Sequence, residues 1–404
     1  MPVLKNISIL YTCRDEGGQS EVHPVENAAI TWTDDTIEWI GKESELPEKY
    51  RSEKSYDAGG KMVIPGLVDC HTHLCFGGWR PDEFEMRIQG RSYLDIAKAG
   101  GGILSTVKVT REASEDELFD KAAGLLNEIH RQGVTAIECK SGYGLSLDDE
   151  LKQLRVYKRL KEKSPIHIVT TFLGAHTFPP EYKENRQGYI SLIINEMIPA
   201  VAEENLAEFC DVFVEESAFT IEEARTIFEA GKKHGLTPKL HADQLSSGGG
   251  AELATEVGAV SADHLEQISD EGIRQMAEKG VVGVTLPLAS LYTQQPYLNC
   301  RPLVEDGVEV AIATDFNPGS APSFDLSLAM MLTCNHGRLT PAEVLKGATI
   351  YAAKAINRNQ TLGSIELGKS ADFLVIDAEN VNEWMYHYKG ARMTTGFLKG
   401  KQIH

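Results

Sequence analysis

The chain has 404 residues, of which 42% are hydrophobic and 25% are charged, a composition typical of globular proteins. Asp and Glu number 59 against 40 Lys and Arg, which leaves a formal net charge of -19. Because long-range repulsion opposes the approach of other anions, this balance argues against nucleic acid and anionic membranes as partners. An anionic small-molecule substrate would need a local cation at its binding site.

The sequence also lacks signals that would direct the chain out of the cytoplasm. The N-terminal residues show no basic region followed by an apolar core, and no apolar stretch approaches the length of a bilayer span. The seven cysteines are scattered and form no Cys-x-x-Cys pair. We therefore expect a cytoplasmic protein with reduced thiols.

The N-terminal part of the chain alternates hydrophobic and polar side chains. Leu4–Tyr11 and Ala28–Ile40 have the pattern of exposed antiparallel strands. This pattern ends before Met62, where the hydrophobic runs become continuous.

Eight continuous apolar runs of strand length follow between Met62 and Asn317, separated by segments with helical spacing. The runs are Val63–His73, Thr135–Ser141, His167–His176, Phe209–Glu216, Pro238–Gln244, Val260–Glu266, Val281–Pro287 and Val308–Asn317. The helical segments include Glu115–Gln132, Asp149–Lys161, Ile194–Leu206, Ile221–His234, Ala251–Val257 and Asp270–Lys279. Glycines that should end helices precede several strands: Gly133, Gly235, Gly258 and Gly280. Eight such alternations predict a closed (β/α)8 TIM-like barrel.

The C-terminal part returns to short strands. Ser323–Asn335 and Pro341–Ile356 fit helices, whereas Phe373–Asp377 and Met393–Leu398 read as strands. The two β-rich ends predict a small β-sandwich domain built from both chain termini. We expect residues 1–61 and 357–404 to form this domain and residues 62–356 to form the catalytic barrel.

The segment Asp69-Cys70-His71-Thr72-His73 ends the first predicted barrel strand. Because strand side chains alternate between two faces, His71 and His73 should point the same way. Two imidazoles at the carboxyl end of a barrel strand are suited to bind a divalent metal. A His-x-His pair also arises by chance, so two ordinary histidines are the alternative for this pair alone.

Three further residues lie at the ends of other predicted strands. His241 lies on the fifth strand, His264 on the sixth and Asp315 at the end of the eighth. The carboxyl ends of barrel strands meet at one face. Several neutral imidazoles and a carboxylate are costly to bury together without a cation or a catalytic role. The combined set predicts a metal centre.

Two motifs resemble the opening and closing segments of the amidohydrolase superfamily: Val63–His73 and Gly363–Val375. Within that superfamily, the chain resembles the imidazolonepropionase family over nearly its whole length. The segments that carry this closer resemblance are Phe76–Arg80, Glu138–Gly144, Phe172–His176, His241–Leu245 and Asp315–Ser320.

This resemblance implies hydrolysis of 4-imidazolone-5-propanoate to N-formimino-L-glutamate in histidine degradation. It also implies a homodimer, and a divalent metal ion, zinc or iron, held by His71, His73, His241 and Asp315. The positions that match the family's substrate contacts are Arg80, Tyr93, Tyr143, His176, Gln244, Asn317, Gly319 and Ser320.

The residue types at these positions suit the proposed contacts, although each has a simpler interpretation. The guanidinium of Arg80 can bind a carboxylate through two hydrogen bonds, or it can pair with Asp82 or Glu83 at the surface. Tyr143 lies between two glycines on a loop, where its phenol can meet a polar ring or merely cap the barrel.

The remaining positions carry weaker signals. Tyr93 can be a core residue of an amphipathic helix, and His176 can be a solvent-exposed or second-layer imidazole. Asn317-Pro318-Gly319-Ser320 is a turn sequence in any protein, but directly after a metal ligand it can offer amide and hydroxyl contacts.

The expected mechanism is attack of a metal-activated water on the ring amide carbonyl. The cation lowers the pKa of its water towards about 7. The oxyanion is held by the metal and by His264 as hydrogen-bond donor, while Asp315 takes the water's proton and passes it to the leaving nitrogen. Some relatives have a glutamate three residues after the fifth-strand histidine. Here that position is Gln244, which cannot move a proton and is assigned to ring binding.

One metal ion is expected rather than two. In two-metal members of the superfamily, a carboxylated lysine on the fourth strand bridges the ions, and Phe209–Glu216 contains no lysine. Lys140, on the second strand, is interpreted as an ion-pairing residue, with Glu138 as its partner. Glu216 as a bridging ligand is the alternative.

Two other functions stay open. A purine or pyrimidine deaminase of this fold would release ammonia, but such enzymes often carry an acidic group where this chain has Gln244. A catalytically inactive scaffold would lose metal ligands, whereas this chain keeps the full set.

Overall fold

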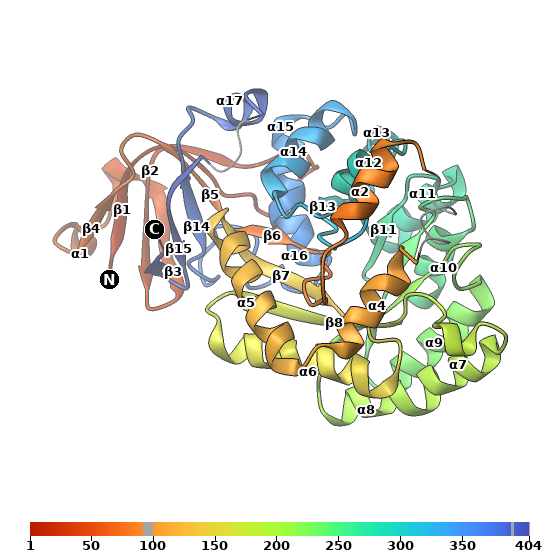
Figure 1. Cartoon of the computed structure of the whole chain (residues 1–404). Coiled ribbons are helices and arrows are strands. Elements are labelled where there is room, and N and C mark those ends of the chain that lie inside the picture. Colours follow the sequence, from red (N-terminus) through yellow and green to blue (C-terminus); the bar gives the residue numbers. More distant parts are fainter. Residues whose placement is uncertain (92–99, 389–391, 404) are drawn as a thin grey trace.

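The computed structural model describes residues 1–91, 100–388 and 392–403. A parallel barrel surrounded by helices is its largest unit, and a second sheet beside it holds both ends of the chain (Figure 1). The barrel strands neighbour one another in chain order. They are β6 (Leu67–Asp69), β7 (Val134–Lys140), β8 (His167–Ala175), β9 (Phe209–Phe213), β10 (Thr237–Ala242), β11 (Ser261–His264), β12 (Val282–Thr285) and β13 (Val310–Ile312).

The barrel closes between β6 and β13 through residues just beyond these strands. Thr72 and Phe316 form a parallel bridge. The amide of His73 donates to the carbonyl of Phe316 at 2.8 Å, and the amide of Asp315 donates to the carbonyl of His71 at 3.1 Å. The predicted (β/α)8 barrel is therefore confirmed. We call this set of backbone bonds between residues 71–73 and 315–316 the seam.

The helices begin and end where local sequence signals place them. Ser114, Thr220 and Thr340 each form a capping box with a glutamate three residues later. They begin helices α5 (Glu115–Arg131), α9 (Ile221–Lys233) and α15 (Pro341–Lys346). The glycines predicted to end helices all have positive φ: Gly133, Gly235, Gly258 and Gly280.

The helices of the barrel region cover its outer surface or follow its last strand (Figure 1). They are α2 (Pro81–Ile88), α4 (Ile103–Glu112), α5 (Glu115–Arg131), α6 (Leu147–Lys163), η2 (Pro180–Tyr182), α7 (Arg186–Leu192), η3 (Ile193–Met197), α8 (Ile198–Glu203), α9 (Ile221–Lys233), α10 (Gly250–Val257), α11 (Asp270–Lys279), α12 (Pro287–Thr293), α13 (Arg301–Glu305), α14 (Leu326–Asn335), α15 (Pro341–Lys346), η4 (Gly347–Tyr351) and α16 (Ala352–Lys354). Within the described ranges, no helix has the length and apolar content that crossing a membrane requires.

The second sheet combines strands from both ends of the chain, as predicted. Its order is β16-β15-β14-β5-β1-β2-β3, with β4 also paired to β1. Near β3, Ile37 exchanges backbone hydrogen bonds with Lys369 and Gly368, so the sheet curls over a core that includes Trp32 and Phe373. The strands are β1 (Val3–Tyr11), β2 (Pro24–Thr33), β3 (Thr36–Lys42), β4 (Ser55–Asp57), β5 (Met62–Pro65), β14 (Phe373–Ile376), β15 (Met393–Leu398) and β16 (Lys401–Gln402). Short helices η1 (Glu43–Glu45), α1 (Glu48–Arg51) and α17 (Val381–Tyr386) lie beside them in the chain.

Two expected segments differ from the structure in their extent. The run Val63–His73 is divided at Gly66, because β5 belongs to the terminal sheet and β6 opens the barrel. A Cβ on Gly66 would lie 2.2 Å from Thr135 Oγ1, so the chain can cross between the sheets here only with glycine. Ala28–Ile40 contains a hairpin, whose tight turn includes Asp34 at φ 52°.

Candidate active site

The imidazoles and the carboxylate predicted to bind metal lie together at the carboxyl end of the barrel. All are buried, with relative exposures of 0% for His71, 2% for His73 and 3% for His241 and Asp315. Asp315 Oδ1 lies 3.5 Å from His71 Nε2 and 3.5 Å from His73 Nε2. The rings of His71 and His241 are 4.5 Å apart between centroids. The barrel thus brings residues from β10 and from beyond β6 and β13 to one point.

The free nitrogen atoms of this cluster fit a cation. The atoms of His71, His73 and Asp315 lie within 4.8 Å of one another, and so do those of His71, His241 and His264. His71 Nε2 and His241 Nε2 are buried without a hydrogen-bond partner among the described residues. A buried nitrogen without a partner is costly unless something else satisfies it. Imidazole nitrogens with a carboxylate are the donor set of zinc and of other first-row metals.

Two carboxylates hold the rings in this orientation. Asp263 Oδ2 lies 2.6 Å from His71 Nδ1, and Asp211 Oδ2 lies 3.0 Å from His241 Nδ1. A carboxylate at Nδ1 fixes that nitrogen as the protonated one and leaves Nε2 as the lone-pair donor. Sequence reasoning missed both residues, although an acid inside a strand as apolar as β9 is a signal that can be read.

Burial keeps two of the predicted ligands, His71 and His73, neutral. It lowers the pKa of His71 and of His73 well below the ordinary value, and the neighbouring imidazoles and Lys140 add to the effect. Neutral imidazole is the form that binds a metal. The cluster is therefore ready to accept a cation at neutral pH.

His264 and Asp315 differ from the other members of the cluster. Burial alone would lower the pKa of His264, but the negative charges of Glu266, Asp315 and Asp263 raise it above the ordinary value. Glu266 Oε2 lies 3.8 Å from His264 Nδ1. Burial raises the pKa of Asp315 to about 6, although the charges of His264 and His241 oppose the rise. Both residues have positive φ, 83° for His264 and 54° for Asp315. Such strain in residues other than glycine is typical of functional sites.

Arg80 lies at the edge of this mouth, where α2 begins. Its Nε donates to Glu83 Oε2 at 3.1 Å, and its Nη1 lies 3.5 Å from Thr106 Oγ1. The guanidinium lies against Gly319, where a Cβ would be 2.3 Å from Nη2, 2.5 Å from Cζ and 2.6 Å from Nη1. The loop after β13 and the start of α2 therefore meet through this guanidinium. The alternative predicted from the sequence is a surface ion pair between Arg80 and Glu83. The ion pair is present, but both side chains are nearly buried, with exposures of 11% and 9%.

Tyr143 and His176 form an aromatic wall beside the metal cluster. The ring of His176 stacks on that of His73 at 5.2 Å and 17°, and Tyr143 lies 5.5 Å from His176 and 5.8 Å from His73. His176 Nδ1 contacts the carbonyl of Gly142 at 3.0 Å. Burial lowers the pKa of His176 to about 3, so this ring is a neutral, flat surface at pH 7.

The other residues expected to contact the substrate differ in burial and in how many hydrogen bonds they already make within the protein. Gln244 is half-buried on the loop after β10. Asn317 Oδ1 accepts hydrogen bonds from the amides of Gly319 and Ser320, and its Nδ2 donates to Ser320 Oγ, so these three residues bond to one another. Tyr93 lies outside the described residues.

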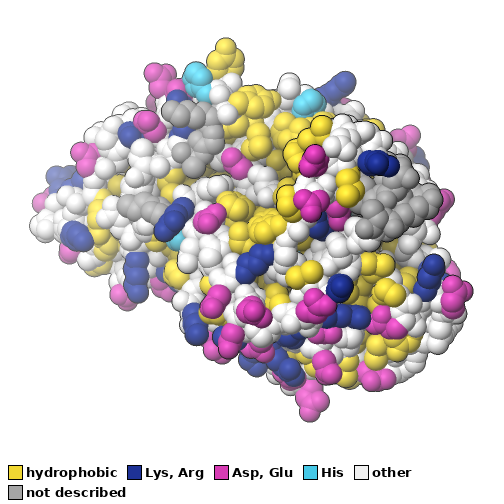
Figure 2. All heavy atoms as spheres, in the orientation of Figure 1, with side chains coloured by type: hydrophobic (Ala, Val, Ile, Leu, Met, Phe, Trp, Pro, Cys, Tyr) yellow, Lys and Arg dark blue, Asp and Glu magenta, His cyan; other side chains and the backbone are white. Residues whose placement is uncertain are grey.

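Neighbouring helices form the rim of the mouth. Phe84 and Ile88 of α2 and Leu291 of α12 are exposed, and Phe84 stacks on Tyr292 with ring centroids 5.4 Å apart. Figure 2 shows acidic and basic side chains interspersed over this side of the molecule, with hydrophobic side chains between them. The rim next to Arg80 is thus apolar while the mouth below it is polar.

Known proteins match the chain over nearly its full length. Residues 62–403 match the family model described as the amidohydrolase family. An imidazolonepropionase of Geobacillus thermodenitrificans (strain NG80-2) is 49% identical over 388 residues, which are 95% of this chain and 91% of that protein. The chain belongs to the imidazolonepropionase family of amidohydrolases. As a member of this family it is a metal-dependent hydrolase.

Solved structures resemble this amidohydrolase in fold. A 5-methylcytosine deaminase from Klebsiella pneumoniae, liganded with 5-fluorocytosine, has a TM-score of 0.75 at 15% identity and covers 100% of this chain and 97% of its own. An adenosine deaminase from Xanthomonas campestris with bound zinc has a TM-score of 0.68 at 17% identity, with coverages of 99% and 92%. At these identities the likeness concerns the fold alone.

The alternative bridging ligand is wrong for this amidohydrolase. Glu216 is exposed, whereas the predicted metal-binding side chains are buried, so it does not belong to their cluster. The ion pair expected between Lys140 and Glu138 is present at 2.9 Å.

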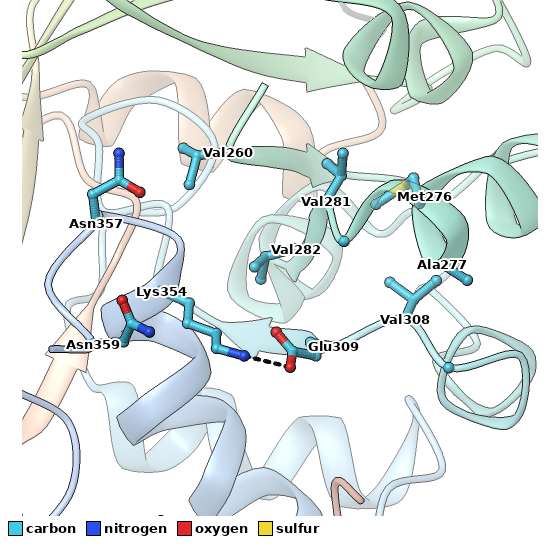
Figure 3. A pocket seen from close by; sticks show the side chains of 12 residues that line it. Val260, Met276, Ala277, Val281, Val282, Val308, Glu309, Lys354, Asn357 and Asn359 are labelled. Atoms are coloured by element: carbon cyan, nitrogen blue, oxygen red, sulfur yellow. Dashed lines mark hydrogen bonds and ion pairs between the residues drawn. The ribbon is translucent and has the colours of Figure 1, made fainter. Parts of the chain in front are cut away.

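A cavity of about 420 Å³ lies at the opposite end of the barrel (Figure 3). Its lining includes Val260, Val282 and Glu309, which stand at the amino ends of β11, β12 and β13. Lys354 projects towards it and pairs at 2.6 Å with Glu309, as Figure 3 shows, and at 2.6 Å with Asp15. Active sites of TIM barrels form at the carboxyl ends of the strands, so we do not place the substrate in this cavity.

Proposed function

We propose that the protein opens the ring of 4-imidazolone-5-propanoate to give N-formimino-L-glutamate, a step of histidine degradation. The observation that carries the proposal is the identity of 49% with a curated imidazolonepropionase over 95% of the chain. The arrangement of the mouth supports it independently, because a neutral aromatic wall lies beside a metal-type cluster and a nearly buried guanidinium lies at the edge of the same mouth. The expected boundary at residue 62 moves to Gly66, because β5 belongs to the terminal sheet. We further propose residues 66–356 as the catalytic unit and the residues before and after them as its supporting domain.

We assign the metal ligands to His71, His73, His241 and Asp315. Their buried nitrogens without partners and their carboxylate support one divalent ion, zinc or iron. When bound, such a cation supplies Lewis acidity and lowers the pKa of water to about 7.

The proton and the developing charge are assigned to two residues of the cluster. Asp315 is the carboxylate of the cluster, and it can accept the proton of the attacking water and return it to the leaving ring nitrogen. His264, whose pKa is raised, donates a hydrogen bond to the carbonyl oxygen as negative charge develops there. Glu266 supports this role because its charge favours the protonated form of His264.

Substrate binding is assigned to the residues around the cluster. Arg80 binds the propanoate carboxylate through its Nη1 and Nη2 groups, since its Nε is held by Glu83. The ring lies against Tyr143 and His176, and Gln244 hydrogen-bonds to it. Asn317, Gly319, Ser320 and Tyr93 complete the proposed contacts, the first three by shaping the turn that faces Arg80.

The assembly and the compartment are part of the same proposal. We expect a homodimer in the cytoplasm, an expectation that rests on the family resemblance. Light scattering on the purified protein measures the assembly, and a monomer at micromolar concentration would contradict it.

The test of the activity is hydrolysis of freshly generated 4-imidazolone-5-propanoate by metal-loaded protein, followed as loss of the ring's ultraviolet absorbance. His241→Ala should abolish the loss, because it removes a proposed ligand. His234→Ala is the matched control, since His234 is exposed at the end of α9, and it should leave the rate unchanged.

Ammonia is assayed in the same samples. Ring loss without ammonia supports the proposal, whereas ammonia release favours a deaminase. No ring loss by protein shown to contain metal would overturn the assignment of the substrate and leave the barrel hydrolase in place.

A further inference from the structure

Five charged side chains fill the barrel interior beneath the metal cluster. Their relative exposure is 0% in every case, although burying a charge is costly unless it is paired. They come from four strands of the barrel, β7, β9, β10 and β11. We call them the charge cluster: Glu138, Lys140, Asp211, Lys239 and Asp263.

Lys140 lies at the centre of the charge cluster. Its Nζ is 2.7 Å from Asp211 Oδ2, 2.9 Å from Glu138 Oε1 and 3.7 Å from Asp263 Oδ2. Burial opposes its charge, but these three carboxylates raise the pKa of Lys140 above the ordinary value. A single ammonium group therefore contacts both of the carboxylates that orient the ligand histidines.

Each of these carboxylates also contacts a ligand histidine, and Asp263 accepts a further hydrogen bond from Ser261 Oγ at 2.6 Å. Asp211 contacts Nδ1 of His241 at 3.0 Å and also accepts its backbone amide at 3.2 Å. Asp263 contacts Nδ1 of His71 at 2.6 Å. If Lys140 were absent, Asp211 would keep no cation within the charge cluster, because Lys239 approaches only Glu138 and Asp263.

The charge cluster carries net negative charge beside the histidines. Its two lysines and three carboxylates leave one net negative charge, which favours a cation at the neighbouring imidazoles. His71, Glu138 and Asp263 also lie within 4.8 Å of one another, but Lys140 and Lys239 contact these two carboxylates, so a second ion has no uncompensated charge there.

We propose that Lys140 is a positioning residue of the metal centre, which holds Asp211 and Asp263 in place and thereby aims Nε2 of His241 and of His71 at one ion. The proposal rests on the metal ligands assigned under the proposed function. Lys140 does not contact the ion, but through these two carboxylates it affects how tightly the ion binds.

The test compares two variants that each remove one buried ammonium group. In Lys140→Met, zinc affinity should fall about 10-fold or more, as is typical when the partners of metal ligands are lost. In Lys239→Met, the matched control, Asp211 keeps Lys140, so zinc affinity should stay close to that of the unchanged protein. Affinity is measured by competition with a chromophoric chelator, without substrate, and melting temperatures of the metal-free proteins are recorded alongside.

Equal zinc affinities in the two variants, with equal losses of melting temperature, would show that Lys140 only fills the barrel and would overturn the proposal. If Lys140→Met does not fold, the double variant Glu138→Gln, Lys140→Met removes one charge of each sign and keeps the net charge. A folded double variant with unchanged zinc affinity overturns the proposal, and one with weakened affinity supports it.

The result is separate from the proposed activity. If the unchanged protein binds no zinc, the metal centre itself fails, whatever Lys140 does. If it binds zinc but does not open the imidazolone ring, the substrate assignment fails while the role of Lys140 stands or falls on the affinities.

Discussion

Replacing Gly319 with alanine should disturb the guanidinium of Arg80 and little else. The added Cβ would lie 2.3 Å from Nη2 and 2.5 Å from Cζ, distances at which one group must move. Gly319 has no positive φ, so its backbone accepts alanine. The group that gives way is the far end of a long side chain, and the fold should therefore tolerate the change.

The expected loss is in substrate binding. Hydrogen bonds to a charged partner contribute about 1.5–3 kcal/mol each, and losing one of them from the carboxylate of the substrate corresponds to a rise in KM of roughly 10- to 150-fold. The carboxylate is remote from the reacting carbonyl, so the contact is equally strong in the ground state and the transition state. Such uniform binding changes KM and leaves kcat nearly unchanged.

Steady-state kinetics on four proteins separate this effect from a general disturbance. Gly248→Ala is the matched control, because a Cβ there would meet only Asp243 Oδ1, at 3.9 Å. Arg80→Met should raise KM at least as much as Gly319→Ala, and the double variant should be no worse than Arg80→Met alone. An unchanged KM in Gly319→Ala would refute the reasoning. So would a KM in the double variant that is higher than in Arg80→Met alone.

Three further outcomes are expected. Glu266→Gln removes a negative charge that raises the pKa of His264. The alkaline limb of the pH profile of kcat, where protonated His264 is lost as pH rises, should therefore move to lower pH. A limb at unchanged pH would show that Glu266 does not control the protonation of His264. Dialysis against a chelator should abolish activity and lower the melting temperature, and zinc at about 1,000 times its Kd should restore about 4 kcal/mol of stability, measured by denaturant unfolding. Trp32→Ala removes a fully buried ring whose centroid lies 5.2 Å from that of Phe373 and 5.0 Å from that of Phe397. The free energy of unfolding of the terminal sheet, measured by urea denaturation, should fall by about 3–5 kcal/mol. A loss below about 1 kcal/mol would contradict the packing of this ring.

The alternation of strands and helices was readable because both signals are local. Hydrophobic periodicity, capping boxes and C-cap glycines depend on residues close in sequence, so α11 and β15 have the predicted bounds. The division at Gly66 was not readable. Met62–Val68 contains no polar side chain, and its two halves pair with strands far away in the chain, β14 and β7. Which sheet a buried strand joins depends on those distant partners.

The residues of the site were also predictable only in part. His71, His241 and Asp315 could be grouped from the sequence, because a closed barrel gathers the ends of its strands. The carboxylates behind them were not identified, since Asp211 and Asp263 lie within strands and their partners depend on how neighbouring strands are staggered. An acidic side chain inside an apolar strand still carries information, because a buried carboxylate requires a partner.

The seam gives metal binding a mechanical consequence for the barrel. His71 and His73 stand on one side of it and Asp315 on the other, joined by the backbone bonds of Asp315 to His71 and of His73 to Phe316. An ion shared by both sides would clamp the first strand to the last, and the ring of strands could then part at this point only by releasing the ion. In amide hydrogen exchange, His73 and Asp315 should therefore exchange by local opening in the metal-free protein and by global unfolding in the loaded one.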